Sequence, residues 1–572
     1  MSAVIGSASS EAPPTFRQLF TPKLVSVLRE GYGLKQLRAD AIAGLTVAIV
    51  ALPLSMAIAI ASGVSPDRGL YAAIVGGFLV SLLGGSRFQV GGPAGAFIVL
   101  VASTVALNGI DGLILATLMS GVFLVGIGYL RVGSYIKFIP YPVTVGFTAG
   151  IAVIIFASQL SELFGLSLDG KEPGELVPKL KALGAAWGTF NPSAILIALL
   201  TVVIIVGLKR ARPSWPGMLV AVAAASIAAV ALALPVETIG TRFGGIPRSL
   251  PMPALPVFDL AKMQAVLPDA IAFTLLGAIE SLLSAVVADG MTGRRHRSNC
   301  ELVAQGFANI GSALFGGLCV TGTIARTATN VRAGAYGPVS GMLHSAFLLL
   351  FILVAAPLAS YIPLPALAGV LAVVAWNMVE KTAFAALLRS SWGDALVLLV
   401  TFALVVFRDL TEGIVVGFSL GSLLFIHRMS QQIAVEVGGA DAADATGDER
   451  QAYDASDATD PDTVIYRISG AFFFGSASTV ASVLDRIADQ RRNFVLDFSA
   501  VPLLDSTAAS VIESAARKAE RAGVRLFVVG ASPQVRRMLF THGVRPPHVR
   551  YKTSVASALK QVRATQTVSL GG

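Results

Sequence analysis

Charged residues are scarce in this chain of 572 residues, where Asp, Glu, Lys and Arg together make up 13% of the sequence. About a quarter of the residues in a soluble globular protein carry a charge. The composition therefore excludes an ordinary soluble globular protein.

Cysteine is nearly absent as well, since Cys300 and Cys319 are the two examples. Two thiols exclude a disulfide framework and a four-cysteine zinc site. The sequence also shows no nucleotide-binding loop, no cluster of metal ligands and no recognisable set of Ser, His and Asp. We therefore expect a protein that is not an enzyme, needs no cofactor or metal, and is not driven directly by ATP.

Hydrophobic residues are abundant instead, at 54% of the chain, and the mean hydropathy is +0.74. Apolar runs long enough to cross a bilayer recur from Ala41 to Ile426. The sequence thus predicts a polytopic α-helical membrane protein. Its net charge of +9 needs no nucleic-acid partner, because basic residues cluster beside the apolar runs, as the positive-inside rule expects.

Composition divides the chain into four parts. A basic N-terminal arm covers 1–40, and an apolar transmembrane domain covers 41–428. The segment 429–462 is acidic and rich in Gly and Ala, which is typical of a flexible linker. The tail, 463–572, alternates strand-like and helix-like patterns and therefore indicates a small α/β domain.

The N-terminal arm has no compact apolar stretch followed by a small-residue cleavage site, so we expect no signal peptide. Both ends are expected in the cytoplasm, because the arm is basic and the polar tail has no export features. The basic loop "MTGRRHRSN" at 291–299 should face the same side. We therefore expect a multi-pass protein of the cell inner membrane.

Fourteen spans are predicted, an even number that agrees with cytoplasmic ends. They lie near 41–61, 68–84, 93–107, 111–130, 140–164, 191–209, 215–234, 267–288, 302–317, 323–333, 337–357, 363–377, 394–407 and 410–427. Two of them, 93–107 and 323–333, are short and follow extended glycine-containing stretches. Non-helical backbone at membrane depth is tolerated only inside protein or around a cavity. One interrupted segment in each half indicates an inverted-repeat transporter with its site at the midplane.

The segment "LCVTGTIARTATNV" carries Arg326 within this apolar body. If Thr323 begins one half-helix and Pro93 begins another from the facing repeat, their free amide groups create an anion site. Arg326 would add a full positive charge one turn into the helix. The alternative is a structural ion pair, most simply with Glu280, and the two roles can coexist.

Glu280 lies within the apolar helix predicted over 268–290, and Ser284 is four residues further on the same face. Carboxylates inside a membrane commonly mark proton or cation sites. Glu280 is thus either a coupling residue that takes up a proton beside a bound anion or a fixed partner for Arg326. The sequence leaves both roles open.

Several stretches together resemble the SulP anion transporter family, which includes bacterial sulfate, bicarbonate and dicarboxylate carriers and the animal protein prestin. They are "DAIAGLTVAIVALPLSMAIAIASGVSPDRGLYAAIVGGF", "GGSRFQVGGPAGAFIV", "GAIESLLSAVVAD", "TGTIARTATN", and, in the tail, "ISGAFFFGSAS" with "LDFSAVPLLDSTAA". The resemblance implies fourteen spans as two inverted repeats of seven, like the uracil permeases, divided into core and gate domains. It also implies that the tail is a cytoplasmic STAS domain.

The resemblance further implies an anion held between the third and tenth spans and backed by the first and eighth. Carried onto this chain, the substrate-binding residues are Leu54, Ile58, Pro93, Ala94, Gly95, Gly322, Thr323, Ala325 and Arg326, and the coupling-ion residues are Glu280 and Ser284. Sodium-coupled bicarbonate relatives tend to have Asp in place of Glu280 and Thr in place of Ser284. Many relatives also have Gln in place of Leu54 and Thr in place of Ala94. These departures favour proton over sodium coupling here.

The tail motif "DSTA" resembles the segment that stand-alone STAS proteins can phosphorylate. That resemblance marks Thr507, with Ser506 beside it, as a possible phosphorylation site at the start of a helix. The alternative is a capping role for Asp505, Ser506 and Thr507, which the residue types favour.

The function that the resemblance implies is secondary active transport of a small anion, such as sulfate, bicarbonate or a dicarboxylate, and the departures named above favour proton symport. Its partners would be H⁺ or Na⁺, the lipid membrane, a second copy of the chain in a homodimer, and a cytoplasmic protein at the STAS domain. Sodium-coupled bicarbonate transport, an anion channel or exchanger, and a signalling protein acting through the STAS domain are the alternatives.

Overall fold

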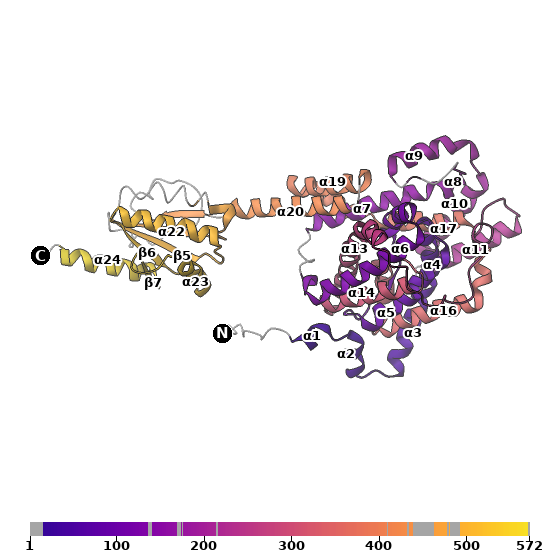
Figure 1. Cartoon of the computed structure of the whole chain (residues 1–572), viewed down its shortest axis with the longest axis horizontal. Helices are drawn as coiled ribbons and strands as arrows, with labels where there is room; N and C mark the ends of the chain where they lie inside the picture. The colour runs from indigo at the N-terminus through magenta and orange to yellow at the C-terminus, as the bar shows by residue number, and fades with distance from the viewer. Residues whose placement is uncertain are drawn as a thin grey trace. The chain divides into compact units, whose positions relative to one another are not determined.

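The computed structural model describes residues 15–134, 140–168, 173, 175–212, 215–408, 410–431, 434–438, 463–477, 480 and 492–569. The chain forms two compact units, Met1–Phe418 and Ser419–Gly572. The first unit is helical and contains the predicted transmembrane domain, and the second contains the predicted STAS domain (Figure 1).

The first unit is a succession of helices. They are α1 (Phe16–Phe20), α2 (Lys23–Arg29), α3 (Leu34–Ala61), α4 (Pro66–Tyr71), α5 (Gly77–Leu83), α6 (Ile98–Tyr129), α7 (Tyr141–Ser158), α8 (Leu160–Phe164), α9 (Leu176–Ala185), α10 (Pro192–Ala211), α11 (Gly217–Ala231), α12 (Ile239–Phe243), α13 (Leu260–Thr292), α14 (Ser298–Leu314), α15 (Ile324–Arg332), α16 (Val339–Ala359), α17 (Leu364–Met378), α18 (Lys381–Ser390) and α19 (Trp392–Phe407). Helix α20 (Leu410–Gln431) continues from this unit into the second.

Nine helical segments among the described residues are long and apolar enough to cross a membrane, and α11 and α19 are shorter apolar helices. The first of the nine, α3, begins at Leu34, which lies inside the predicted arm. The predicted spans 93–107 and 111–130 fall in one segment, Gly95–Tyr129. Gly109 interrupts its helical conformation with a φ of 70°, a left-handed value that glycine adopts without steric cost.

Two short strands cross at the centre of the first unit. Strand β1 (Gly91–Gly92) pairs antiparallel with β2 (Thr321–Gly322), so Gly91 lies opposite Gly322. A side chain would fit at neither Gly92 nor Gly322. An added Cβ on Gly92 would overlap Arg326, and one on Gly322 would overlap Gln89. Glycine therefore permits the close approach of two backbone segments that are far apart in sequence.

Small residues also let the long helices pack closely. Gly121 on α6 and Gly306 on α14 face each other: an added Cβ on Gly121 would lie 2.8 Å from the carbonyl oxygen of Gly306, and one on Gly306 would lie 2.6 Å from that of Gly121. In lipid, where the hydrophobic effect does not drive association of helices, such contacts supply much of the packing energy. They hold α6 and α14 together.

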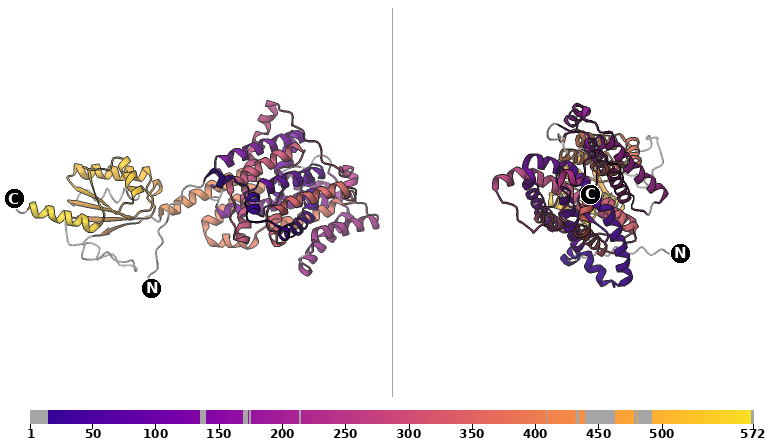
Figure 2. Two further views of the ribbon diagram at one scale, coloured as in Figure 1. Left: turned by 90° about the horizontal axis from the view of Figure 1, so that it is seen from below. Right: turned by 90° about the vertical axis from the view of Figure 1, so that its right-hand side faces the viewer.

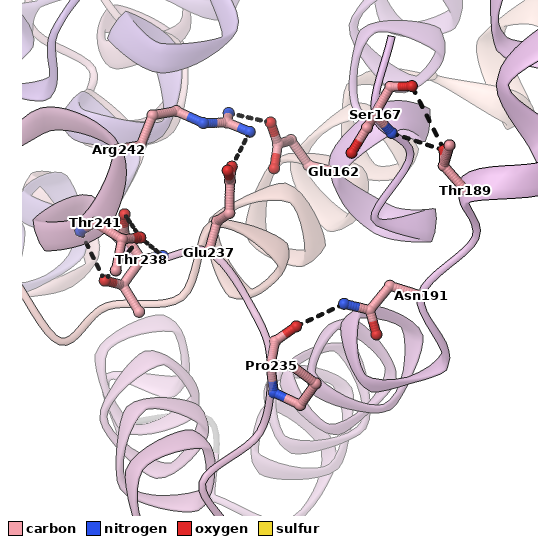
Figure 3. A network of polar contacts seen from close by, with 9 residues as sticks. All are labelled: Glu162, Ser167, Thr189, Asn191, Pro235, Glu237, Thr238, Thr241 and Arg242. Carbon is pink, nitrogen blue, oxygen red and sulfur yellow. Dashed lines mark hydrogen bonds and ion pairs between the residues drawn. The ribbon is translucent and has the colours of Figure 1, made fainter.

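A polar network joins α8, α12 and the segment that precedes α12. Figure 3 shows Arg242 of α12 reaching both Glu162 of α8 and Glu237, with which it forms ion pairs. The Thr238 side chain caps α12 by accepting a hydrogen bond from the Thr241 backbone N–H at 3.2 Å. These contacts fix α8 against α12.

The second unit is built on a five-stranded sheet in the order β3-β4-β5-β6-β7, with β3 antiparallel and the other pairs parallel. Its strands are β3 (Ala434–Gly438), β4 (Thr463–Ser469), β5 (Asn493–Ala500), β6 (Arg525–Val529) and β7 (Val549–Lys552), and its helices after α20 include α22 (Ser506–Arg521), α23 (Pro533–Thr541) and α24 (Val555–Ser569).

Side chains alternate between the two faces of this sheet, as the pleat requires. Phe494 and Leu496 of β5 share a hydrophobic cluster with α22 and α23, whereas Val495 packs with α24. Figure 2 shows the ribbon of this unit, with its helices around the sheet. Covering both faces with helices is the arrangement expected for a parallel sheet.

The predicted linker at 429–462 is wrong at its start. Helix α20 extends to Gln431, and β3 occupies Ala434–Gly438, where it pairs with β4. Glu436 is one of the acidic residues that favour a linker, but its backbone belongs to the sheet, where it lies opposite Arg467. Residues 439–462 lie outside the described part of the chain.

Candidate functional site

A cavity of about 1360 Å³ opens beside the strand crossing. Its wall combines residues from the first unit's helices that are distant in sequence, including α3, α10, α13, α15 and α17. The predicted site residues that line it are Leu54, Ile58, Pro93, Ala94, Gly95, Glu280, Thr323, Ala325 and Arg326. Two others, Gly322 and Ser284, are buried behind the wall.

Two helix starts meet the cavity, as the interrupted-span pattern predicted. Thr323 precedes α15, and Ala94 precedes a short 3₁₀ helix, Gly95–Phe97, that leads into α6. Neither start has a side-chain cap. Unpartnered amide groups and the positive end of the helix dipole favour an anion, so this is chemically an anion-binding geometry.

Arg326 is almost fully buried, with 1% of its surface exposed. Its Nη1 donates to the carbonyl oxygen of Gly91 at 3.3 Å. Its Nη2 donates to the Ser55 hydroxyl at 2.9 Å and to the Pro93 carbonyl oxygen at 3.3 Å. The guanidinium thus ties the segment of β1 to α3, and its Nε is left without a hydrogen-bond partner.

The alternative of an ion pair between Arg326 and Glu280 is wrong. Among the described residues, the partners of Arg326 are neutral oxygens, and no ion pair joins it to Glu280. A buried charge that faces only dipoles is costly. Arg326 therefore keeps an uncompensated positive charge at the cavity wall, which a bound anion would neutralise.

Glu280 contributes the carboxyl group to the same cavity and is 8% exposed. Within the described part of the chain, its carboxyl group has neither a hydrogen bond nor an ion pair. Ser284 does not share the cavity with it, because its hydroxyl donates to the Thr327 hydroxyl at 3.0 Å. The helical spacing placed both residues on one side of α13, but only Glu280 is free to meet a ligand.

The rim of the cavity carries an excess of positive charge. Lys209, Arg210 and Arg332 line it and are exposed. The acidic residue of the exposed rim, Glu380, accepts a hydrogen bond from the Tyr141 hydroxyl at 3.3 Å. A basic rim raises the local concentration of anions.

Sequence reasoning missed three polar residues that support the site. Ser55 holds Arg326, and Thr327 receives hydrogen bonds from both Ser284 and the Val90 backbone N–H. Gln89 packs against Gly322 behind the cavity. Ser55 follows Pro53 in an otherwise apolar span, and that isolated polar residue was the available signal.

In the second unit, Asp505 caps α22. One of its carboxylate oxygens accepts from the Ala508 backbone N–H at 2.8 Å and the other from the Phe474 backbone N–H at 2.9 Å. Ser506 and Thr507 begin the helix and are exposed. Capping by Asp505 is therefore present, and the two hydroxyl groups are accessible to solvent.

Comparison with known proteins gives matches over nearly the whole chain. The model of the sulfate permease family matches residues 37–401, and that of the STAS domain matches residues 455–558. The putative sulfate transporter YvdB of Bacillus subtilis is 40% identical over 524 residues, which cover 90% of this chain and 95% of that protein.

Two solved structures are similar as well. The transmembrane domain of a cyanobacterial bicarbonate transporter, BicA, is 34% identical, with a TM-score of 0.61 and coverage of 67% of this chain and 98% of that one. The murine Slc26a9 anion transporter in the inward-facing state shares the fold at 18% identity, with a TM-score of 0.82 and coverage of 98% and 97%. The predicted fold class, a helical membrane protein with a C-terminal α/β STAS domain, is confirmed.

Proposed function

Because this chain belongs to the sulfate permease family, we propose that it is a secondary carrier of small anions that couples their uptake to protons. The observation that carries the proposal is the cavity in which Glu280 and Arg326 lie without being paired to each other. The relatives named above support anion transport, and the choice of sulfate, bicarbonate or a dicarboxylate is left to experiment.

The anion would bind at the two helix starts, beside Arg326. It would bring negative charge toward the Glu280 carboxylate, and a proton on Glu280 would remove the repulsion between them. Anion binding then favours proton binding, and by linkage the proton strengthens anion binding by the same factor. Because both would cross the membrane together, the inward proton gradient would drive the anion.

Purified protein in proteoliposomes would test this proposal with a panel of labelled sulfate, bicarbonate and dicarboxylates. The pH and sodium gradients would be set independently. We expect uptake of at least one of these anions to increase with an inward proton gradient and to be unchanged by sodium. Uptake that requires sodium would contradict proton coupling.

Sodium-coupled bicarbonate transport is the second candidate, and the similarity to BicA favours it. Against it stands Ser284, whose hydroxyl is engaged with Thr327 rather than directed into the cavity. An anion channel is the third candidate. Counterflow distinguishes it, because only a carrier shows faster exchange when substrate is present on the opposite side.

We further infer that the protein acts as a homodimer in the cell inner membrane with both termini in the cytoplasm. The family membership and the basic residues beside the spans support this arrangement. The STAS domain would then be available to a cytoplasmic protein, and Ser506 and Thr507, exposed at the start of α22, would be its candidate phosphorylation sites.

A further inference from the structure

A second buried carboxylate lies behind the cavity, on α14. Glu301 is 0% exposed and accepts three hydrogen bonds. They come from the Ser86 backbone N–H at 3.0 Å, from Nε2 of Gln89 at 2.9 Å and from Nε2 of Gln305 at 3.0 Å. All three partners are hydrogen-bond donors. An ionised carboxylate, which has acceptor sites only, suits such surroundings best. The transport cycle described above gives this group no role.

Gln89 connects this carboxylate to the coupling helix. Its Nε2 also donates to the Ser281 hydroxyl at 3.0 Å, and Ser281 directly follows Glu280 in α13. The Glu301 carboxylate fixes the orientation of the amide, because rotating the amide by 180° would place its oxygen against a carboxylate oxygen. The same amide packs against Gly322, where an added Cβ would overlap it, so a displaced Gln89 would disturb β2 as well.

The next residue, Val90, makes a second connection to α13. Its backbone N–H donates to the Thr327 hydroxyl at 3.2 Å, and Thr327 accepts from Ser284 at 3.0 Å. Ser281 and Ser284, which both follow Glu280 on α13, are therefore each connected to the segment that leads into β1, Ser281 directly by Gln89 and Ser284 through Thr327. The connection from Ser281 continues through Gln89 to Glu301.

We propose that Glu301 is a positioning residue for ion coupling: through the amide of Gln89 it sets the position of Ser281 and so of the Glu280 side chain at the cavity. This inference rests on the proposed coupling role of Glu280. Glu301 itself touches neither the anion nor the proton that is transported.

The test uses the full-length protein in proteoliposomes carrying Glu301→Gln. Two quantities are measured with an anion that the wild type transports: the rate of exchange at a fixed, equal pH, and the pH at which uptake is half-maximal. The substituted amide cannot accept from all three donors. We expect exchange to fall about tenfold, the effect typical of losing a hydrogen bond to a charged group, and the half-maximal pH to shift.

Two further variants separate positioning from general stability. Gln305→Met removes another donor from the same carboxylate but leaves the contact between Glu301 and Gln89, so it should keep the wild-type rate and pH profile. The double variant Gln89→Glu with Glu301→Gln exchanges the amide and the carboxylate. It should recover part of the lost rate and return the half-maximal pH toward the wild-type value.

A folded Glu301→Gln protein with wild-type exchange and a wild-type pH profile would overturn the proposal. If this variant fails to fold, Ser281→Ala removes the other end of the connection, and an unchanged pH profile in that variant would overturn it equally. If wild-type uptake shows no pH dependence, proton coupling has failed. The exchange rates of Glu301→Gln and Gln305→Met then still decide whether Glu301 positions the site.

Discussion

Arg326 is buried against neutral oxygens, so its charge is balanced by no carboxylate among the described residues. This arrangement gives the site an attraction for anions that an ion pair with Glu280 would have cancelled. The Arg326 guanidinium therefore has two roles. Its two Nη atoms donate hydrogen bonds to the backbone of residues 91–93, and its charge faces the cavity. Substitutions that separate charge from hydrogen bonding are therefore informative.

Replacing Arg326 by alanine should weaken anion binding by about tenfold or more, because a hydrogen-bonded charge contributes about 1.5–3 kcal/mol. Ser55→Ala is the matched control. It removes one partner of Nη2 but keeps the positive charge, so it should have a smaller effect. Binding of the transported anion to purified protein checks both variants, and wild-type affinity in a folded Arg326→Ala protein would contradict the assignment.

Gly92 should tolerate no side chain, because an added Cβ would overlap the Arg326 guanidinium. We expect Gly92→Ala to displace Arg326 and to lose most transport. Gly207→Ala, on α10, is the control, since an added Cβ there meets nothing within 4 Å and alanine favours a helix. Initial uptake rates of Gly92→Ala and Gly207→Ala, measured at equal protein amounts, check this prediction. Equal rates would show that the β1–β2 pair accommodates a methyl group at Gly92.

At the scale of elements, the polar network around Arg242 fixes α8, whose residues Leu163 and Phe164 line the cavity. Arg242 is about one-third exposed, with 37% of its side chain accessible, so each ion pair should contribute only about 0.2–1 kcal/mol. Arg242→Ala should therefore lower the melting temperature slightly and leave anion selectivity unchanged. A change of selectivity measured with mixed anions would mean that α8 shapes the site.

The sequence predicted the two interrupted helices because an extended stretch with glycine precedes each of them and their apolar runs are too short to span a membrane. It did not predict the pairing of β1 with β2. A strand of two residues has no periodicity, and its partner lies more than two hundred residues away in the chain. Strand β3 was missed for a related reason, since its Glu and Gly residues resemble a linker and only pairing with β4 stabilises them as a strand.

The sequence predicted some features of the site and not others. Residues on helices followed from spacing or from the family resemblance, and most of them line one cavity. Whether Arg326 and Glu280 pair was left open by the sequence, because it depends on the rotamers of two side chains from different elements. The connection from Glu301 to Ser281 depends on three separate segments and could not be inferred from a pattern in any one of them.

On the scale of the whole molecule, the boundary between the two units falls within α20, and the cavity lies entirely in the first unit. Truncation after Gln431, at the end of α20, should leave a membrane domain that folds. Its transport rate or expression should change, but its preference among anions should be that of the full chain. An altered preference in competition assays would mean that residues of the tail contribute to the site.

If a proton on Glu280 couples to the anion, replacing this carboxyl group by an amide in Glu280→Gln should abolish the coupling. The amide imitates the protonated carboxyl group, so the variant should bind and exchange the anion. Its uptake into proteoliposomes should no longer be accelerated by an inward proton gradient, whereas wild-type uptake should be. A Glu280→Gln protein that kept the full wild-type acceleration by the proton gradient would contradict coupling through Glu280.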